Sequence, residues 1–310
     1  MKILVTGGAG FIGSHIADLL IQKGYDVVVI DNLEKGNILN VNNKAKFYKA
    51  DICSKDLFLI FERENFSAVI HQSAKVNVRK SIENAKDYAE TNIIGTINLL
   101  ECCRKFGVKK IIYAASASRY GIPEYLPCDE KHSLMPLSPY ALSKLTAEDY
   151  IKIYSNLFGI CYTFLVYSNV YGERQNFSEE SGVISIFINK LLKNQQPIIF
   201  GSGEQTRDFT YVGDVAYANY LALTNKNAEN KTINLSYSEE TSINSLYEKI
   251  KNILNSELMP LYKPKIKGEI EKIYLSNQLL FSLFSWKPQT NLDEGLKKTI
   301  EYYKSLYSTT

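Results

Sequence analysis

The sequence lacks any tract of a single charge, which limits the partners that the chain could have. Its 310 residues include 36 basic and 33 acidic side chains, for a net charge of +3. These charges are spread along the chain without a run of about five or six of one sign. A nucleic-acid-binding surface normally needs a basic stripe or patch. The sequence therefore indicates no nucleic-acid partner.

Metal-ligand clusters and long apolar stretches are also missing. The five cysteines form neither a CxxC motif nor a Cys/His cluster. We therefore expect no metal site and interpret the cysteines as free thiols in a reducing cytosol. No apolar run approaches the roughly 18 residues of a membrane span. Because Met1 leads directly into a strand pattern without a signal-peptide core, we expect a cytoplasmic protein that does not enter a membrane.

Two kinds of segment alternate along the first half of the chain. Short β-branched runs are separated by apolar-periodic segments of helical length, a pattern typical of a parallel sheet covered by helices. We therefore predict an α/β protein with a Rossmann-type doubly wound parallel sheet. The expected strands are 3–6, 27–30, 47–49, 68–70, 111–113 and 162–166, and the expected helices between them are 12–23, 54–64, 83–106 and 139–158.

The pattern changes after about residue 170 into turns, a short strand and further helices. We expect residues 1–170 to form the sheet domain and residues 171–310 to form a smaller C-terminal α/β lobe for the substrate. No linker, repeat or low-complexity tract marks the boundary, so the two lobes should interleave through crossovers. The helices expected in the second lobe are 183–193, 212–224, 242–255 and 292–306.

A glycine-rich turn follows the first expected strand and opens the first expected helix. It reads Gly7-Gly8-Ala9-Gly10-Phe11-Ile12-Gly13, and glycines there let a pyrophosphate approach the amides at the positive helix end. Asp31 ends the second strand at about the 20-residue spacing at which a carboxylate binds the adenosine ribose hydroxyls. That carboxylate would repel a 2′-phosphate, so the pattern favours NAD over NADP.

A tyrosine and a lysine share one face of a later helix. Tyr140 and Lys144 are four positions apart in Ser138-Pro139-Tyr140-Ala141-Leu142-Ser143-Lys144. A nearby ammonium and a nicotinamide cation would lower the tyrosine pKa and let the phenolate accept a proton. Ser116 ends the fifth expected strand, at the edge of the sheet where ligands bind. The three residues together predict proton transfer coupled to hydride transfer.

With these motifs the chain resembles the extended short-chain dehydrogenase/reductase superfamily, and within it the UDP-glucose 4-epimerase-like family. The resemblance covers nearly the whole length. Besides the glycine turn, Ser116 and the Tyr140/Lys144 pair, its carriers are Asp31-Asn32-Leu33, His71-Gln72-Ser73-Ala74, Val78-Arg79-Lys80-Ser81, Asn92, Tyr167-Ser168-Asn169-Val170-Tyr171-Gly172 and Arg207-Asp208-Phe209.

The resemblance implies a set of roles. Ser116, Tyr140 and Lys144 would be catalytic. The implied NAD contacts are Gly7, Gly10, Phe11, Ile12, Gly13, Asp31, Asn32, Asp51, Ile52, Gln72, Ser73, Ala74, Asn92, Tyr140 and Lys144. The implied contacts with a UDP-sugar are Lys75, Ser116, Ser118, Tyr140, Asn169, Val183 and Arg207.

The reaction that the resemblance implies is inversion of C4 of a UDP-hexose or UDP-N-acetylhexosamine. The sugar would be oxidised transiently to a 4-keto form, rotate, and be reduced from its other face, with NAD regenerated. Such enzymes typically form homodimers through two long helices, which here are 83–106 and 139–158.

Several positions depart from the family pattern. Ala115 and Arg119 flank the serine motif, and Val166 replaces the usual arginine of a Leu-Arg-Tyr segment. Near the C-terminus, Ile266 and Ser276 stand where many relatives carry an arginine and an aspartate. Ile273 falls near the position that in relatives helps to choose between plain and N-acetylated hexoses, and we draw no substrate from it.

Other functions remain open on the sequence. A 4,6-dehydratase would need an acid/base pair after the serine, where this chain has Ala117 and Ser118. A uronate epimerase or a decarboxylase would use the same redox residues. A catalytically silent NAD-sensing protein would have the fold without the chemistry, but the presence of Ser116, Tyr140 and Lys144 together favours an enzyme.

Overall fold

The computed structural model of the chain describes residues 1–176, 182–266 and 270–308. The chain divides into two compact units, each made of several segments. The first unit comprises residues Met1–Gly121, Leu134–Val166 and Val215–Ile233, and the second comprises Ile122–Ser133, Tyr167–Asp214 and Asn234–Thr310. The chain changes unit at Val166–Tyr167, close to residue 170, but it also changes at other places. A single boundary near 170 therefore does not describe the division.

The first unit is built around the expected doubly wound sheet. Its seven strands are ordered β11 (Lys231–Leu235), β6 (Cys161–Tyr167), β5 (Lys110–Ser116), β4 (Ala68–His71), β1 (Lys2–Thr6), β2 (Asp26–Asp31) and β3 (Lys46–Lys49). The neighbouring pairs from β3 to β5 are all parallel. The chain leaves β1 for β2 on one side and later returns to β4 on the other. The strand order thus reverses between β1 and β4, where open α/β sheets form a ligand crevice at the carboxyl ends of their strands.

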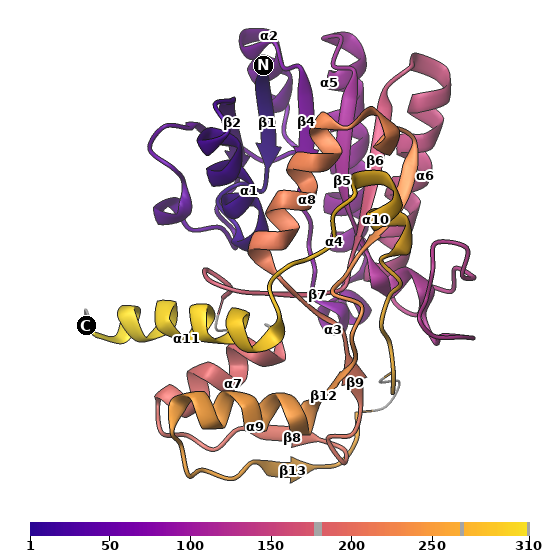
Figure 1. Ribbon diagram of the computed structural model, residues 1–310. Helices are drawn as coiled ribbons and strands as arrows, with labels where there is room; N and C mark the ends of the chain where they lie inside the picture. Colours follow the sequence, from indigo (N-terminus) through magenta and orange to yellow (C-terminus); the bar gives the residue numbers. More distant parts are fainter. Residues whose placement is uncertain (177–181, 267–269, 309–310) are drawn as a thin grey trace. The chain divides into compact units, whose positions relative to one another are not determined.

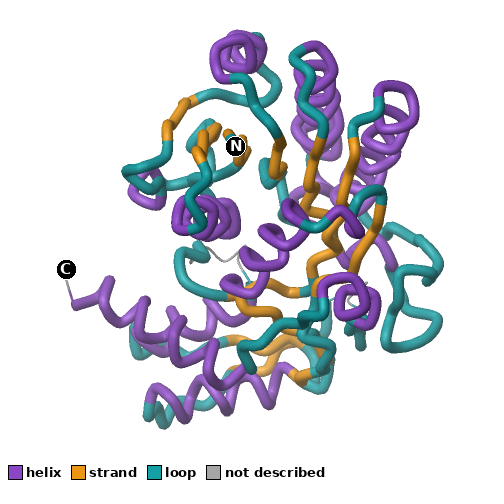
Figure 2. Tube along the Cα trace, turned by 45° about the horizontal axis from the view of Figure 1, so that its top comes forward, coloured by secondary structure: helices purple, strands orange, loops and turns teal. Residues whose placement is uncertain are grey.

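Helices cover both faces of this sheet (Figure 2). On one face, α2 (Asp56–Glu64) contacts α5 (Gly95–Lys105), and α5 contacts α6 (Pro139–Phe158). Figure 1 shows α1 (Phe11–Gln22) and α8 (Val212–Thr224) in front of the strands. Right-handed crossovers explain this arrangement, because connections that run in opposite directions along the sheet pass over opposite faces.

The segment expected as one helix over 83–106 is divided in the structure. It contains α4 (Ala85–Ala89), a π-helical turn η2 (Glu90–Ile94) and α5, and the separate helix α3 (Val78–Glu83) ends where it was expected to begin. Apolar periodicity does not reveal a π turn, since one extra residue in a turn changes the pattern only locally.

Helix α8 was expected in the second lobe, but from Val215 onward it belongs to the first unit. Packing explains the difference. Tyr220 of α8 lies edge-on to Tyr25, with ring centroids 6.4 Å apart, and below the ammonium of Lys23. Both partners follow α1, and α8 then leads through a loop into β11, the last strand of the sheet.

The second unit has a separate hydrophobic core. Helices α7 (Val183–Leu192), α9 (Ile243–Leu254) and α11 (Leu292–Ser308) contact one another (Figure 1). Phe187, Leu246, Tyr247 and Ile300 are among the side chains buried between them. The remaining elements are a short helix and paired short strands: α10 (Gln278–Phe284), β7 (Asn169–Tyr171) with β10 (Phe209–Tyr211), β8 (Ile198–Phe200) with β13 (Leu261–Lys263), and β9 (Thr206–Arg207) with β12 (Thr241–Ser242).

Across the described ranges, with their gaps at 177–181 and 267–269, no helix combines the length and apolarity needed to cross a membrane.

Candidate active site

The loop after β1 needs glycine at two positions for steric reasons. Gly7 has a φ of +67°, and a Cβ there would lie 2.8 Å from the amide nitrogen of Ser73. A Cβ on Gly13 would lie 2.2 Å from the carbonyl oxygen of Gly7. Helix α1 begins after Gly10 without a side-chain cap and has no acidic residue in its first turn. The backbone at the positive helix end is therefore bare, as phosphate binding requires.

Asp31 connects the end of β2 to this loop. Its carboxylate accepts hydrogen bonds from the backbone amides of Ala9, at 3.1 Å, and Leu33, at 2.8 Å. The side chain is buried, and burial raises its pKa against the effect of these amides. Each carboxylate oxygen can accept more than one hydrogen bond. Asp31 can therefore hold the glycine loop and still accept bonds from a ligand.

The predicted adenine-side residues form a second group of hydrogen bonds. The Asn32 side chain donates to Asp51 at 2.8 Å, and the amide of Cys53 donates to the same carboxylate at 2.7 Å. Burial would raise the Asp51 pKa, but these bonds outweigh it and leave the pKa below its usual value. Ile52 is buried and approaches the backbone of Gly95 closely.

The segment after β4 carries four more of the predicted residues. The amides of Gln72 and Ser73 donate to Thr6 of β1, so this segment lies beside the glycine loop, together with the half-buried Ala74. The Lys75 ammonium lies 2.5 Å from an oxygen of Asp87 and 3.4 Å from one of Glu34. Lys75, which was predicted to contact substrate, is thus paired with two acidic side chains in this structure.

Asn92 lies on the π turn and is almost completely buried. Its side chain accepts from the amide of Lys75 at 2.8 Å and donates to the Lys75 carbonyl at 3.0 Å. It also donates to the Ser143 hydroxyl at 2.9 Å, and Ser143 donates to the carbonyl of Tyr140. Asn92 therefore links the segment after β4 to the first turn of α6.

The start of α6 is set by residues whose local effects are well understood. The Ser138 hydroxyl caps the helix by accepting from the amide of Ala141 at 3.1 Å, and Pro139 occupies the first turn. From this start, Tyr140 and Lys144 both point into buried surroundings, where they are 9% and 4% exposed.

Ser116, Tyr140 and Lys144 lie together in the first unit. The Ser116 hydroxyl lies close enough to the Tyr140 phenol to lower the pKa of that phenol, and it accepts from the Ser118 hydroxyl at 2.9 Å. Lys144 lies over the ring of Tyr113 of β5, with 4.1 Å between its nitrogen and the ring centroid. A proton donor or acceptor and its partners are therefore preassembled at the carboxyl end of β5.

Burial acts on the pKa values of both Tyr140 and Lys144. Burial raises the Tyr140 pKa, and the hydrogen bond with Ser116 offsets only part of that effect. Burial also lowers the Lys144 pKa to about 7, while the nearby carboxylate of Glu148 acts in the opposite direction. The expected lowering of the tyrosine pKa considered the neighbouring ammonium and a bound nicotinamide cation, and did not consider the loss of water around the phenol, which disfavours its charged form.

Sequence analysis missed one residue of this region. Glu148 lies one helical turn after Lys144, and its carboxylate receives a 2.7 Å hydrogen bond from Arg119. The four-residue spacing from Lys144 was visible in the sequence and could have indicated it.

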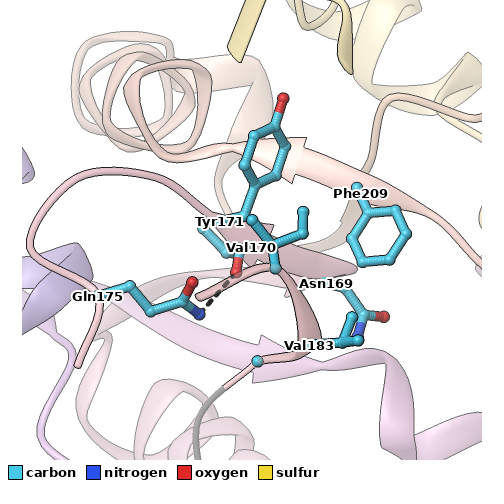
Figure 3. Close-up of a pocket in the computed structure, with 8 residues that line it drawn as sticks. Asn169, Val170, Tyr171, Gln175, Val183 and Phe209 are labelled. Carbon is cyan, nitrogen blue, oxygen red and sulfur yellow. Dashed lines mark hydrogen bonds between the residues drawn. The ribbon is translucent and has the colours of Figure 1, made fainter. Parts of the chain in front are cut away.

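The predicted substrate contacts of the second unit lie on short elements. Asn169 and Val183 line one pocket together with Phe209 and Gln175 (Figure 3). The Gln175 side chain donates to the carbonyl of Val170 at 3.2 Å. Asn169 is exposed and Val183 is half-buried, so both side chains are accessible to a ligand.

Arg207 of β9 is half-buried, and its guanidinium donates to the carbonyl of Thr206 at 2.7 Å. The next residue, Asp208, is buried and accepts from the amide of Leu275 at 3.2 Å. Burial raises the Asp208 pKa to about 7. Asp208 thus serves the interior of the second unit, beside the chain segment that contains the departures Ile273 and Ser276, both of which are buried.

Comparison with known proteins identifies the family of the chain. The model of the "NAD dependent epimerase/dehydratase family" matches residues 3–236. A curated protein of Methanocaldococcus jannaschii, provisionally assigned as a UDP-glucose 4-epimerase, is 51% identical over 304 residues, which are 98% of each chain.

Two solved structures are similar over almost the full length. UDP-glucose 4-epimerase of Thermotoga maritima, crystallised with UDP-glucose, has a TM-score of 0.96 and 39% identity, covering 99% of this chain and all of that chain (100%). UDP-N-acetylglucosamine 4-epimerase of Methanobrevibacter ruminantium, in complex with UDP-N-acetylmuramic acid, has a TM-score of 0.93 and 34% identity, covering 98% of each chain.

The residues of the first unit fit the cofactor of this family, which is NAD. The glycine loop leaves no space for a Cβ where the backbone must be bare. Asp31 stands at the end of β2 with its carboxylate directed to that loop, where a ribose-binding acid belongs. The chain is thus an NAD-dependent protein.

Proposed function

Because the chain belongs to the NAD-dependent epimerase/dehydratase family, we propose that it is an isomerase that inverts C4 of a UDP-hexose or UDP-N-acetylhexosamine. The observation that carries the proposal is the placement of Tyr140 and Lys144, both buried and one turn apart on α6, with the Ser116 hydroxyl acting on the Tyr140 phenol. This arrangement provides a proton acceptor, a hydroxyl that orients it and a cation that stabilises its charged form.

The NAD-binding residues that we propose lie in the first unit. The amides of the glycine loop and of the first turn of α1 would hold the pyrophosphate, and Asp31 would accept from the ribose. Asn32, Asp51 and Ile52 would surround the adenine. Residues 72–74 and Asn92 would lie along the nicotinamide half. When bound, NAD supplies a hydride acceptor at C4 of the sugar and afterwards returns that hydride.

The proton follows a path through this chain's own groups. As a phenolate, Tyr140 accepts the proton of the sugar 4-hydroxyl while C4 loses its hydride. The Ser116 hydroxyl exchanges hydrogen bonds with the Tyr140 oxygen and the oxygen on C4 of the sugar, and so orients both. Lys144 as an ammonium stabilises the phenolate. After the 4-keto sugar has rotated in the site, Tyr140 returns the proton to the oxygen on C4. Because C4 is reduced from its other face, its configuration is inverted.

The substrate-binding residues are proposed with the same reaction in mind. In the first unit, Lys75, Ser116 and Ser118 would contact the sugar. In the second unit, Asn169 and Val183 would bind through the pocket that they share. The planar guanidinium of Arg207 suits a diphosphate.

The relatives' names leave the sugar open, because one structure is of a UDP-glucose epimerase and the other of a UDP-N-acetylglucosamine epimerase. A 4,6-dehydratase is disfavoured by the residues after Ser116. Ser118 uses its hydroxyl on Ser116 at 2.9 Å, and Ala117 has no acidic group. A uronate would need a cation for its carboxylate, and no observation favours a uronate at this site over the neutral sugars.

We also propose a homodimer formed through the long helices of the first unit. Helix α6 exposes Leu142, Ile153 and Leu157, which are 54%, 52% and 68% accessible, and the neighbouring π turn exposes Ile94. Exposed apolar side chains gathered on adjacent helices are typical of a protein interface. Light scattering at several concentrations would test the dimer, and a monomer at all of them would exclude it.

The experiment that tests the reaction is product analysis by NMR. The purified protein is incubated separately with UDP-glucose, UDP-N-acetylglucosamine and UDP-glucuronate, and the configuration at C4 is measured over time. We expect equilibration with the galacto epimer for one or both of the first two substrates. Conversion of UDP-glucuronate alone would replace the proposed substrate class. Loss of water to a 4-keto-6-deoxy product, or no reaction of any substrate while NAD is bound, would contradict the proposed reaction.

A further inference from the structure

A buried ion pair connects the two elements that carry the candidate catalytic residues. Arg119 lies in the short turn Ala117–Tyr120 that directly follows Ser116, and Glu148 lies on α6 one turn after Lys144. The Arg119 Nη1 donates to Glu148 Oε2 at 2.7 Å, and the two side chains are only 7% and 1% exposed. The pair therefore holds the serine turn against the helix of Tyr140 and Lys144.

Stability alone does not account for this pair. Arg119 Nε and Glu148 Oε1 are buried and have no hydrogen-bond partner within the described part of the chain. Removing two charges from water is costly, and an incomplete set of hydrogen bonds leaves part of that cost uncompensated. By contrast, the ion pair of Lys152 and Asp149 on the same helix keeps both side chains exposed to water, with exposed fractions of 37% and 61%. A well-packed apolar pair in place of Arg119 and Glu148 would stabilise the fold at least as well.

The pair acts on the environment of Lys144. The groups that face this lysine are His71 from β4, Tyr113 from β5, and Tyr140 and Glu148 from its own helix. Glu148 is the carboxylate among them. Burial lowers the Lys144 pKa to about 7, and the negative charge of Glu148 favours the ammonium. Without that charge, burial would act unopposed and Lys144 would lose its proton below neutral pH.

Glu148 in turn depends on Arg119. Burial raises the Glu148 pKa, and Arg119 is the first of the cations that oppose this, followed by Lys152 and Lys144. From β5, Tyr113 also faces the Glu148 charge. A buried carboxyl without its guanidinium partner would take up a proton and become neutral.

We propose that Arg119 and Glu148 are a positioning pair, in which the Arg119 guanidinium keeps Glu148 as a carboxylate and Glu148 keeps Lys144 as an ammonium beside Tyr140. The inference rests on the proposed function, because it assigns the pair to proton transfer by Tyr140. The pair acts through Lys144 and through the position of the Ser116 turn.

The test compares three variants with the wild type and with a matched control. The variants are Glu148→Gln, Arg119→Met and the double variant Arg119→Met/Glu148→Gln. The control is Glu294→Gln, which removes the partner of Lys298 at the same four-residue spacing on the exposed side of α11. The Lys144 titration is followed by NMR of isotope-labelled lysine and assigned with Lys144→Arg. The kcat and KM for the UDP-sugar are measured across pH, together with bound NAD and the unfolding temperature.

Both single variants should shift the Lys144 titration to lower pH by about one unit. The kcat at neutral pH should fall about fivefold and recover as the pH is lowered, because lower pH returns the proton to Lys144. KM and bound NAD should stay within about twofold of the wild type. In the double variant no lone charge remains in the core, so the unfolding temperature should recover while the shifted titration persists. Glu294→Gln should match the wild type throughout.

An unshifted Lys144 titration in Glu148→Gln would overturn the inference, whatever its activity. So would a double variant in which stability, titration and kcat all return to wild-type values, because the pair would then be purely structural. If the single variants do not fold, the double variant provides the titration. If neither the wild type nor any variant converts a UDP-sugar, the proposed function fails. If the Lys144 titration still shifts in that case, the effect of the pair on Lys144 stands.

Discussion

In the first unit the candidate residues Asn92, Tyr140 and Lys144 are buried, whereas in the second unit the candidates lie at exposed or half-buried positions on short strands and a helix end. Asn92 makes three side-chain hydrogen bonds in the interior of the first unit. Asn169 of the second unit is exposed. Groups that move protons need fixed geometry and a defined dielectric, while groups that select a sugar need access. The difference suggests that redox chemistry and substrate choice can be changed separately.

The strongest way to break the redox half is Tyr140→Phe. Turnover should fall by about 10²–10⁴-fold because the proton acceptor is lost, whereas bound NAD should not change. Turnover is measured by NMR and NAD by its release after denaturation. Tyr150→Phe, on the exposed side of the same helix, is the control. A Tyr140→Phe protein with wild-type turnover would remove Tyr140 from the mechanism.

Gly13→Ala tests whether the cofactor loop depends on backbone space. The added Cβ would lie 2.2 Å from the carbonyl oxygen of Gly7, so the loop must shift. We expect most of the bound NAD to be lost, with about 1–3 kcal/mol less unfolding free energy. The control is Gly24→Ala, where no atom lies within 4 Å of the added Cβ but φ is +83°. It should lose about 1 kcal/mol and keep its NAD. Equal NAD content in the two variants would contradict the steric argument.

Arg207→Met tests the substrate half in isolation. Loss of a charged contact to the diphosphate should raise KM by about 10–100-fold, with kcat and bound NAD within about twofold of the wild type. Lys249→Met is the control, since it removes a surface ion pair with Asp293 in the same unit. A large loss of NAD in Arg207→Met would show that the two halves are not separable.

The smallest effect concerns the pH dependence of the unfolding free energy. The pKa values of two buried carboxyls, one in each unit, are shifted in opposite directions. In the first unit, burial opposes ionisation of Glu64, but bonds from Lys46, Tyr48 and Lys2 outweigh it and lower its pKa to about 2. Its contribution is present above about 4.5, the unfolded value, and is lost as the pH falls toward 2. Glu64→Gln should remove this stabilisation, about 1–2 kcal/mol after allowance for solvent screening.

Asp208 of the second unit should act in the opposite way. Burial raises its pKa to about 7 from 3.8, so ionisation destabilises the fold as the pH rises between these values. Asp208→Asn should remove that fall in stability. Chemical denaturation at a series of pH values measures both variants, and parallel curves for the two would contradict the assignment.

Local signals explain what could be predicted. The expected helix 139–158 has the same bounds as α6, because Ser138 and Pro139 start it and Gly159, with a φ of +68°, ends it. The six expected strands all lie within strands of the sheet, because β-branched residues favour the extended conformation and such runs between helices are typical of buried strands.

Contacts between distant segments explain what could not be predicted. The unit to which α8 belongs depends on Tyr25 and Lys23, about 200 residues away in the chain. The π turn at Glu90–Ile94 places Asn92 next to Lys75 and Ser143, and neither partner is visible in the local pattern.

By itself the sequence determined the sheet, the glycine loop with Asp31, and the spacing of Tyr140 and Lys144, because covalent spacing and backbone sterics act over a few residues. Only the tertiary structure decided the charge states. Burial raises the Tyr140 pKa and lowers that of Lys144, and Arg119 meets Glu148 across 29 residues of chain. The energy of a charge depends on the water removed from it and on the charges that packing brings close, and neither quantity can be obtained from spacing along the chain.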